Sequence, residues 1–320
     1  MGDKNPGTRK MSAASNQPVL VEKLRQGISN FTPRQRGLAE FILQNPESLA
    51  FLTITDLARR VGVSEATITR FCSTLGYEGY AHLCREVQET IQSELSTVGR
   101  FQLVRTMGRR PVEPRSPTGF ERVLSNEIDN LMNLTKHIRR ADFYACADLI
   151  ANADRVCIVG SMASSSLADY FGYMLGKIFP HVDVLHGHGG MASAACKRLG
   201  PNSLAFLICF PRYPRATVEL GRRAAQKGAK IIAITNSPIS PVVPLANMTF
   251  LIPIGIVSFV DAYAAPMAFL NALVTEFSER KPDATQQSLK LFDEYVSLEG
   301  IFIKSGIKSA ERRLPSGGIE

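Results

Sequence analysis

The sequence predicts a small all-helical unit followed by a larger α/β unit built on a parallel five-stranded sheet. Two observations predict this order. Residues 20–96 carry apolar residues at helical spacing with short breaks, whereas from residue 155 onwards short apolar strands alternate with helices. The chain of 320 residues is also long enough for two domains, and its 45% of hydrophobic residues suffices for two cores.

Composition narrows the function classes before any motif is considered. The longest apolar runs, such as residues 204–210, are far shorter than the roughly 20 residues of a membrane span, and no apolar signal segment opens the chain. We therefore expect no membrane partner. The six cysteines form no C-x-x-C pair, so we expect reduced thiols in the cytoplasm, without a metal or cofactor.

The net charge of +8 suits a nucleic-acid partner. It is not concentrated in a basic arm, since residues 1–100 hold 12 Lys and Arg against 10 Asp and Glu. Any DNA-binding hypothesis must therefore rest on geometry rather than on charge.

The clearest helix start lies at Thr32. Thr32 and Gln35 form a capping box, with Pro33 at the first helical position. Apolar residues then recur at helical spacing, and Asn45-Pro46 ends the helix because the residue before proline avoids the α region.

Two further helices follow with a tight turn between them. Thr53 caps the first, and Gly62 ends it in the left-handed backbone that glycine adopts most easily. Ser64 caps the second, which Gly76 stops. Ala58 supplies the small residue that two closely crossing helices need, so this spacing predicts a helix-turn-helix.

The second helix of this pair would turn its polar face outward. In a DNA-binding helix-turn-helix, the N-terminal part of that helix contacts base edges in the major groove. Arg70 suits a bidentate contact to guanine, and Ser64 suits a phosphate at the helix N-terminus. The candidate DNA-binding residues are Arg34, Arg36, Ser64, Glu65, Ala66, Thr67, Thr69, Arg70 and Ser73. A generic pair of helices with a solvated outer face is the alternative.

Five apolar segments predict the strands of the α/β unit. The predicted strands are residues 155–159, 182–185, 203–210, 230–235 and 248–253, and the predicted helices are residues 120–138, 142–151, 167–178, 192–199 and 217–226. Strands that alternate with helices indicate a parallel sheet covered on both faces.

A serine-rich loop follows the first strand, where ligands of parallel sheets bind. Serine hydroxyls and helix N-terminal N–H groups together make a phosphate cradle. The candidate ligand residues in this loop are Gly160, Ser161, Ser164, Ser165 and Ser166. A serine-rich helix cap is the alternative. A dinucleotide fingerprint fits poorly, because Met162 and Ser165 stand where glycines would be needed.

We expect five segments along the chain. Disordered tails cover residues 1–19 and 305–320, the helix-turn-helix domain covers residues 20–96, and the ligand-sensing domain covers residues 120–304. Residues 97–119 collect Pro, Gly and Arg and are interpreted as a solvated linker.

The order of these parts resembles the RpiR (MurR/RpiR) family of bacterial transcriptional regulators. The resemblance is carried by FTPRQRGLAEFILQNPES, TITDLARRVGVSEATITRFCSTLGYEGY, VCIVGSMASSS, FPRYPRATVELGRRAAQKGAKIIAITNSPISPVVPLAN and LFDEYVSLEGIFI. It implies an N-terminal helix-turn-helix and a C-terminal sugar isomerase (SIS) domain used as a sensor, commonly of a sugar phosphate. In this sequence Met162 replaces a usual glycine, and Arg212 stands where a second serine-rich phosphate element is usual. Arg212 is either a charged fork for an anionic ligand or a structural or interface arginine.

The resulting prediction is a dimeric or tetrameric DNA-binding regulator of carbohydrate or related carbon metabolism. It would bind a pseudo-palindromic double-stranded operator. It would also sense a small anionic metabolite, and the resemblance points to a sugar phosphate or another anion of this kind.

The alternative is a phosphosugar isomerase, which needs a general base. His181, His186 and His188 are the clustered histidines, and the sequence places no carboxylate beside them. We therefore predict a non-enzyme. A pure scaffold is a third class, which the intact polar face of the second helix disfavours.

Overall fold

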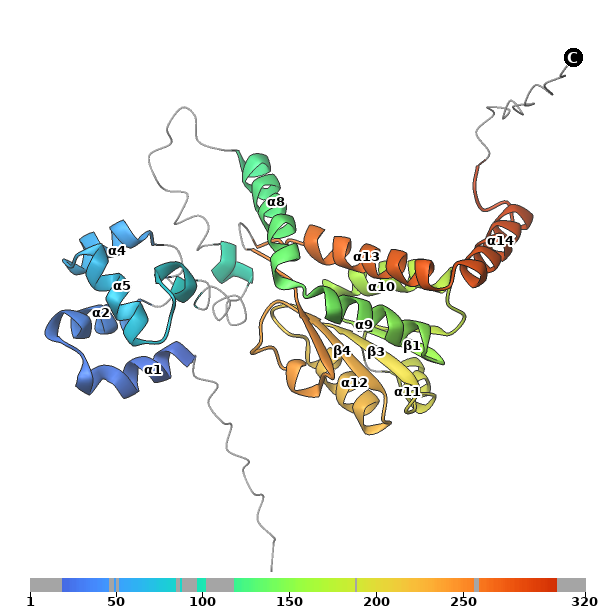
Figure 1. The fold of residues 1–320 in the computed structure, drawn as a ribbon, viewed down its shortest axis with the longest axis horizontal. Helices are drawn as coiled ribbons and strands as arrows, with labels where there is room; N and C mark the ends of the chain where they lie inside the picture. Colours follow the sequence, from blue (N-terminus) through green and yellow to red (C-terminus); the bar gives the residue numbers. More distant parts are fainter. Residues whose placement is uncertain are drawn as a thin grey trace, which may run out of the picture.

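The computed structural model describes residues 19–45, 49, 52–84, 87, 97–101, 118–187, 189–255 and 259–303. Within them a helical unit and an α/β unit are distinct bodies (Figure 1). The two predicted tails and residues 102–117 of the predicted linker lie outside the described residues, except for Val19 at the start of the first helix.

The helical unit is built from short helices. The elements are α1 (Val19–Gly27), η1 (Ile28–Asn30), α2 (Pro33–Gln44), α4 (Ile54–Val61) and α5 (Glu65–Thr74). The sequence predicts the caps of α2, α4 and α5. The Thr32 capping box is present, and Thr53 accepts a hydrogen bond from the backbone N–H of Asp56. Gly62 has φ of 72°, and Ser64 caps α5. These contacts confirm the predicted helix starts and the predicted turn.

Aliphatic and aromatic side chains from every helix of this unit meet in one core. Leu24, Leu38, Leu57 and Phe71 are fully buried there. The ring of Phe31 meets that of Phe71 edge-on, with 5.2 Å between centroids. This packing fixes the crossing of α4 and α5.

The α/β unit contains the five parallel strands that the sequence predicts. They are β1 (Arg155–Gly160), β2 (Val182–Leu185), β3 (Ser203–Ile208), β4 (Lys230–Thr235) and β5 (Met248–Leu251), in the order β2-β1-β3-β4-β5. Two strands end two residues earlier than predicted, at Ile208 and at Leu251, although the N–H groups of Cys209 and Ile252 still donate to carbonyls of β4. The carboxyl ends of β1 and β3 are neighbours, which brings the loops after them to one edge.

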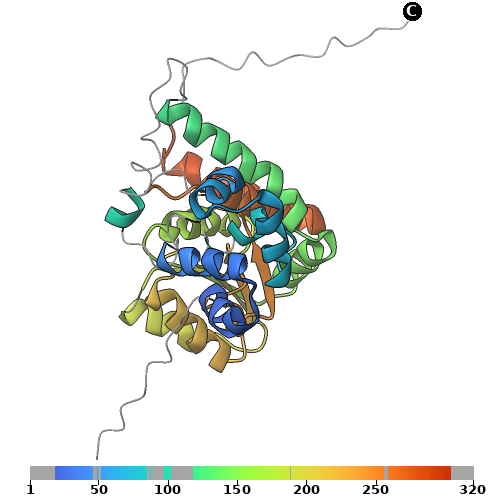
Figure 2. The same ribbon diagram turned by 90° about the vertical axis from the view of Figure 1, so that its left-hand side faces the viewer.

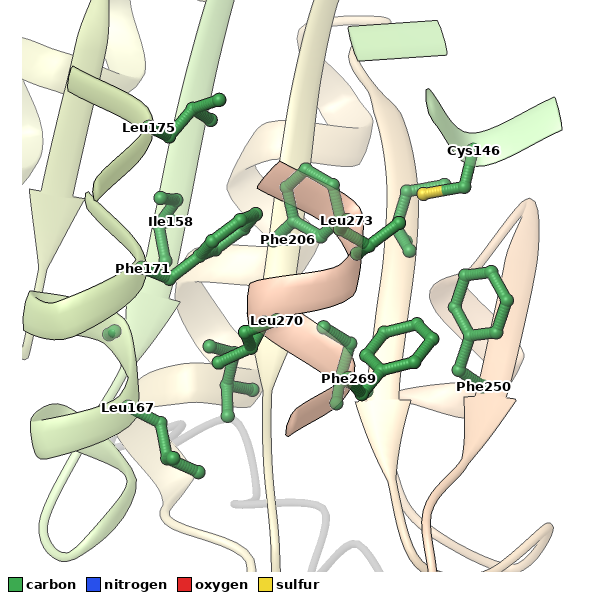
Figure 3. Close-up of a cluster of buried hydrophobic side chains, with 14 of the residues drawn as sticks. Cys146, Ile158, Leu167, Phe171, Leu175, Phe206, Phe250, Phe269, Leu270 and Leu273 are labelled. Carbon is green, nitrogen blue, oxygen red and sulfur yellow. The ribbon is translucent and has the colours of Figure 1, made fainter. Parts of the chain in front are cut away.

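Helices cover both faces of the sheet. α9 (Arg140–Ala151), α10 (Ser164–Gly176) and α13 (Ala264–Arg280) bury one face, and α11 (Gly190–Lys197) and α12 (Arg215–Gln226) bury the other. On the first face Phe171 lies edge-on to Phe206 at 5.1 Å, and Leu270 and Leu273 of α13 pack beside them (Figure 3). No helix was predicted in the region of α13.

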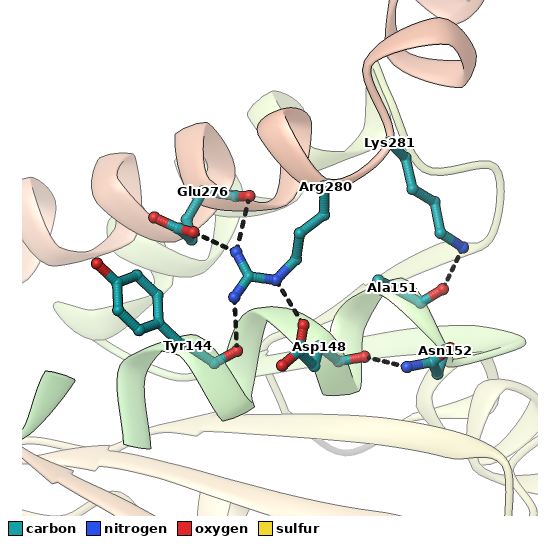
Figure 4. Close-up of polar contacts among 7 residues, drawn as sticks. All are labelled: Tyr144, Asp148, Ala151, Asn152, Glu276, Arg280 and Lys281. Atoms are coloured by element: carbon teal, nitrogen blue, oxygen red, sulfur yellow. Dashed lines mark hydrogen bonds and ion pairs between the residues drawn. The ribbon is translucent and has the colours of Figure 1, made fainter. Parts of the chain in front are cut away.

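α13 is fixed to α9 by a polar joint at its C-terminus (Figure 4). The Arg280 guanidinium donates to Asp148 at 2.6 Å and to the Tyr144 carbonyl at 3.1 Å, and it also contacts Glu276. Lys281 donates to the Ala151 carbonyl. α14 (Pro282–Leu298) begins directly after this joint, and α8 (Gly119–His137) precedes α9.

Candidate DNA-binding face and ligand loop

The outer face of α5 is polar and accessible, as predicted. Its inner residues Ile68, Phe71 and Cys72 are buried in the core of the helical unit. Among the predicted DNA-contact residues on α5, Thr67 is half-buried. The other five are exposed, namely Glu65, Ala66, Thr69, Arg70 and Ser73. The same packing that buries one side of α5 thus presents the other side to solvent.

Several of these polar side chains make contacts within the helix-turn-helix. The Glu65 carboxylate accepts a 2.6 Å hydrogen bond from the Thr55 hydroxyl of α4. Thr69 and Ser73 donate to the carbonyls one turn earlier, at 3.1 and 3.2 Å. Glu65 therefore links the two crossed helices, and Arg70 is the long cationic side chain on this face.

The predicted phosphate contacts come from the start of α5 and from α2. Ser64 is exposed and caps α5 by accepting the Thr67 N–H at 3.2 Å, while the other N–H groups of the first turn have no partner within the helix. Arg34 and Arg36 are exposed in the first turn of α2. The structure gives no nucleic-acid contact, so these roles stay predictions.

The serine-rich loop leaves the carboxyl end of β1 and enters α10. A Cβ at Gly160 would lie 2.5 Å from the Ser164 carbonyl oxygen and 2.8 Å from the Cβ of Ala168, so this position must be glycine. Met162 has φ of 57° and an exposed side chain. A left-handed residue at this position explains why glycine would be favoured there.

Two serines of the loop are buried and face hydroxyl partners from distant elements. The Thr217 hydroxyl of α12 donates to Ser161 at 3.1 Å, and the hydroxyls of Ser164 and Tyr263 lie 3.4 Å apart. Sequence reasoning missed Thr217 and Tyr263, because only the fold brings them to the loop. Burial raises the pKa of Tyr263 to about 12, so its hydroxyl keeps its proton at neutral pH.

The remaining serines do not cap α10. Its N-cap residue is Ala163, without a side-chain cap, and the Ser166 hydroxyl donates to the Ala163 carbonyl at 2.8 Å. Ser165 is half-buried and Ser166 is exposed. The alternative interpretation of the loop as a serine cap is therefore wrong. The hydroxyls of Ser164, Ser165 and Ser166 belong to the first turn of α10 instead.

Arg212 lies in the loop after β3, on the same edge of the sheet. It is exposed, and its guanidinium donates to the Thr97 hydroxyl at 3.1 Å. Arg212 therefore contacts the connector between the two units rather than the serines. Whether it also binds a ligand stays a prediction.

The connector itself differs from the predicted solvated linker. Residues 97–101 are helical and pack on the α/β unit. The Arg100 guanidinium, whose side chain is only 7% exposed, forms a 3.0 Å ion pair with Asp261, and the Phe101 and Phe259 rings meet with 6.2 Å between centroids. A linker prediction from composition could not foresee a partner 161 positions away.

His186 has a carboxylate beside it, contrary to the expectation from sequence. Its Nε2 lies 2.9 Å from an Asp169 carboxylate oxygen, and its Nδ1 lies 3.0 Å from the Gly160 carbonyl oxygen. Asp169 is on α10, which packs across β1 and β2. His181 lies just before β2, at the amino end of that strand, and His188 lies outside the described residues.

Two features are absent from the described part of the chain. None of its helices is long and apolar enough to cross a membrane. It also contains no group of three or more His, Cys, Asp or Glu side chains arranged to hold a metal ion.

Comparison with known proteins identifies both units. Residues 19–94 match the family described as "Helix-turn-helix domain, rpiR family", and residues 149–276 match the SIS domain. Its two units are thus a helix-turn-helix of the rpiR family and a SIS domain with a five-stranded parallel sheet.

Two curated relatives illustrate the range of proteins that share these units. The HTH-type transcriptional regulator HexR of Pseudomonas aeruginosa is 27% identical over 229 residues, covering 69% of this chain and 75% of HexR. The "Bifunctional protein glk" of Burkholderia thailandensis is 26% identical over 223 residues, covering 68% of this chain. The chain spans about a third of the length of that protein, 33%.

A solved structure shares the fold of both units. The NanR protein of Vibrio vulnificus, solved in complex with ManNAc-6P, aligns with 87% of this chain and 98% of its own, with a TM-score of 0.52 and 21% identity. This similarity shows that the chain has the same fold as the NanR protein over the aligned residues.

Proposed function

We propose that this RpiR-family chain is a ligand-responsive DNA-binding transcriptional regulator of carbohydrate or related carbon metabolism. The observation that carries the proposal is the polar outer face of α5, held outward by a fully buried inner face in a capped helix-turn-helix. The relatives named as transcriptional regulators support it. Such a protein acts in the cytoplasm, and on the nucleoid when it is bound to DNA.

In the proposed complex, α5 lies in the major groove of a double-stranded operator. Arg70 reads a base edge or holds a phosphate, while Ser64 and the α5 N-terminus, with Arg34 and Arg36, contact the backbone. One helix-turn-helix reads only a half-site, so a homodimer or homotetramer would bind a pseudo-palindromic operator.

The proposed ligand is a small anionic metabolite bound at the loop after β1. The hydroxyls of Ser161, Ser164, Thr217 and Tyr263 lie near the uncapped N-terminus of α10, and such a set suits phosphate oxygens. The NanR protein was solved in complex with a sugar phosphate, ManNAc-6P, which supports this ligand class. Arg212 would supply the positive charge. Its guanidinium would give up its hydrogen bond to the Thr97 hydroxyl and bind the anionic ligand instead.

This change of partner at Arg212 would couple ligand binding to DNA binding. Thr97 belongs to the connector that leads from the helix-turn-helix, so a ligand that recruits Arg212 removes one contact of the connector with the SIS domain. The ligand then shifts the population of connector positions, and with it the spacing of two helix-turn-helix units.

Footprinting of the DNA upstream of the chain's own gene, with and without a panel of sugar phosphates and organic acids, tests the proposal. We expect a protected palindrome whose occupancy changes with one member of the panel. An absence of protection under every condition would remove the regulator proposal.

An isomerase is the second candidate, and the Asp169–His186 pair is the observation that favours it. The geometry also weighs against it, because both ring nitrogens of His186 already face protein oxygen atoms, so neither is turned toward a substrate. An aldose–ketose isomerase assay of the full chain and of His186→Gln discriminates. Turnover that the substitution abolishes would favour the enzyme.

A further inference from the structure

The edge at which the strands of the sheet begin carries a polar cluster on the face covered by α11 and α12. Cys157 of β1 packs on that face and lies in register with Asp183 of β2. Side chains alternate between the two faces along a strand, so Arg155, two residues before Cys157, points the same way. Arg155 and Asp183 therefore share one face at the start of their strands.

The Asp183 carboxylate holds two arginines in place. Arg155 donates to one of its oxygens at 2.9 Å, and Arg198, which follows α11, donates to the other at 2.6 Å. A guanidinium carries five N–H donors. Within the described part of the chain neither arginine side chain makes a further hydrogen bond, so most of their donors remain for a ligand.

A cavity of about 510 Å³ opens beside these arginines, a size typical of small-molecule sites. Its polar lining residues are Asp154, Arg155, His181, Arg198, Asn202 and Ser203. β1 begins at Arg155 and ends at Gly160, so this cavity and the serine-rich loop lie at opposite edges of the sheet. We call it the amino-end cavity, and it is separate from the ligand site proposed above.

The turn that leads into β4 brings further cations to the wall of the cavity. A Cβ at Gly228 would lie 3.4 Å from the Cγ of Pro201, which lines the cavity. Lys227 and Lys230 stand on either side of Gly228 in the chain, and both are exposed. The lysines of this turn therefore lie beside the amino-end cavity.

The surroundings of the cavity hold most of the excess positive charge of the chain. Residues 190–230 contain eight Lys and Arg against one Glu, and all eight cations are exposed. Their net charge of 8 − 1 = +7 compares with +8 for the whole chain. In both views α12, which carries part of this charge, lies on the side of the α/β unit opposite α8 (Figure 1, Figure 2).

The negative groups near the cavity do not cancel this charge. The carboxylates of Asp154 and Asp183 offset the two arginines, so the excess comes from the other cations around them. α11 and α12 both end at this edge, and each helix C-terminus adds only about half a negative charge. The field at the cavity therefore favours an anion.

We propose that the amino-end cavity binds a nucleotide through its di- or triphosphate group. Guanidinium forks match phosphate oxygens, and the lysines of the neighbouring turn supply the charge that a polyphosphate needs. The serine-rich loop instead offers neutral hydroxyls, which suit a single phosphate ester. A cavity of this volume also has room for the organic part of a nucleotide. The chain would thus bind a second class of metabolite, whether or not it binds DNA.

Calorimetric titration of the full chain with magnesium-free ATP tests the site. We expect one site per chain, and an affinity about tenfold lower for Arg198→Ala, which loses charge-assisted hydrogen bonds to phosphate. The Arg198 side chain is 47% exposed, so the variant should keep its fold, which circular dichroism checks.

The matched control is Arg222→Ala, which removes the same charge from an exposed position of α12 outside the cavity lining. It should keep the wild-type affinity for ATP to within about twofold, because a charge outside the site is screened by solvent. A wild type that does not bind ATP, or equal losses in Arg198→Ala and Arg222→Ala, would overturn the proposal.

Two further titrations define the ligand class and the place of binding. AMP, which has a single phosphate, should bind about tenfold more weakly than ATP, and equal affinities would contradict recognition of a polyphosphate. Ser164→Ala alters the serine-rich loop and should leave ATP binding unchanged. A loss of ATP binding in Ser164→Ala but not in Arg198→Ala would place the nucleotide at that loop and overturn the proposal.

Discussion

The guanidinium of Arg100 lies 3.0 Å from the carboxylate of Asp261, although 161 positions separate the two residues. Arg100 belongs to the short helical connector, and Asp261 lies just before α13. Because the Arg100 side chain is almost fully buried, the pair is shielded from solvent and makes the connector part of the SIS surface. A change in this surface therefore reaches the chain segment that leads to the helix-turn-helix.

Removing this ion pair should destabilise the SIS domain and release the connector. Arg100→Ala leaves the Asp261 carboxylate without its buried partner, which costs about 1–3 kcal/mol. The measurement is the urea midpoint of unfolding. Arg139→Ala is the control, because it removes an exposed arginine that pairs with Asp142 three residues away, and its midpoint should be nearly unchanged. Equal midpoints for Arg100→Ala and wild type would contradict a stabilising role.

The close approach at Gly160 gives a second prediction. Gly160→Ala forces its methyl group against the Ser164 carbonyl and Ala168, so the loop and α10 must shift, at a cost of about 1–3 kcal/mol. Thermal unfolding measures this loss. Gly176→Ala is the control in the same helix, where no atom lies within 4 Å of the added Cβ, and it should stabilise by about 0.4–1 kcal/mol. An unchanged unfolding temperature for Gly160→Ala would show that the loop and α10 can shift to accept the methyl group without loss of stability.

Arg70 carries the third prediction, which concerns DNA rather than stability. If Arg70 reads a base, Arg70→Ala should weaken binding to the operator by about 1–3 kcal/mol and relax the preference at one base pair. Arg222→Ala, an exposed arginine of α12, should bind as the wild type does. Competition titrations with operator variants report both effects. Uniform weakening across all sequences would assign Arg70 to a phosphate instead.

Alkaline pH should destabilise the SIS domain through its buried thiols. Burial raises the pKa of Cys157 and of Cys209 from the ordinary 9.0 to about 12. Between these values the folded state binds more protons than the unfolded state, so stability is fully present below pH 9 and falls as the pH rises toward 12. Urea midpoints at about pH 7.5 and about pH 10, on either side of the ordinary thiol pKa, measure the loss.

A double variant isolates the contribution of the two thiols. Cys157→Ala with Cys209→Ala should lose less stability than the wild type over the same pH interval, although its stability at neutral pH is lower. The same thiols should resist alkylation in the folded protein at about pH 8 and react after unfolding. A pH dependence identical to that of the wild type would assign the alkaline loss to other groups.

Local sequence suffices to predict the helix-turn-helix and the strands of the sheet. Thr32, Thr53, Ser64 and Gly62 act on backbone groups close to them in the chain, so their caps and the turn can be predicted from local spacing. The strands are apolar throughout because a parallel sheet is buried on both faces, which also leaves a local pattern. The predicted DNA-contact face follows, since burying the inner face of α5 turns Arg70 outward.

The remaining features depend on how the elements are assembled in space. α13 supplies much of one core, yet no side-chain cap marks its start, and no helix was predicted there. The contacts of Arg100 with Asp261, Arg212 with Thr97 and His186 with Asp169 join residues from separate elements. Such pairs depend on which strands are neighbours and how helices lie across them. Local sequence propensity determines neither of these.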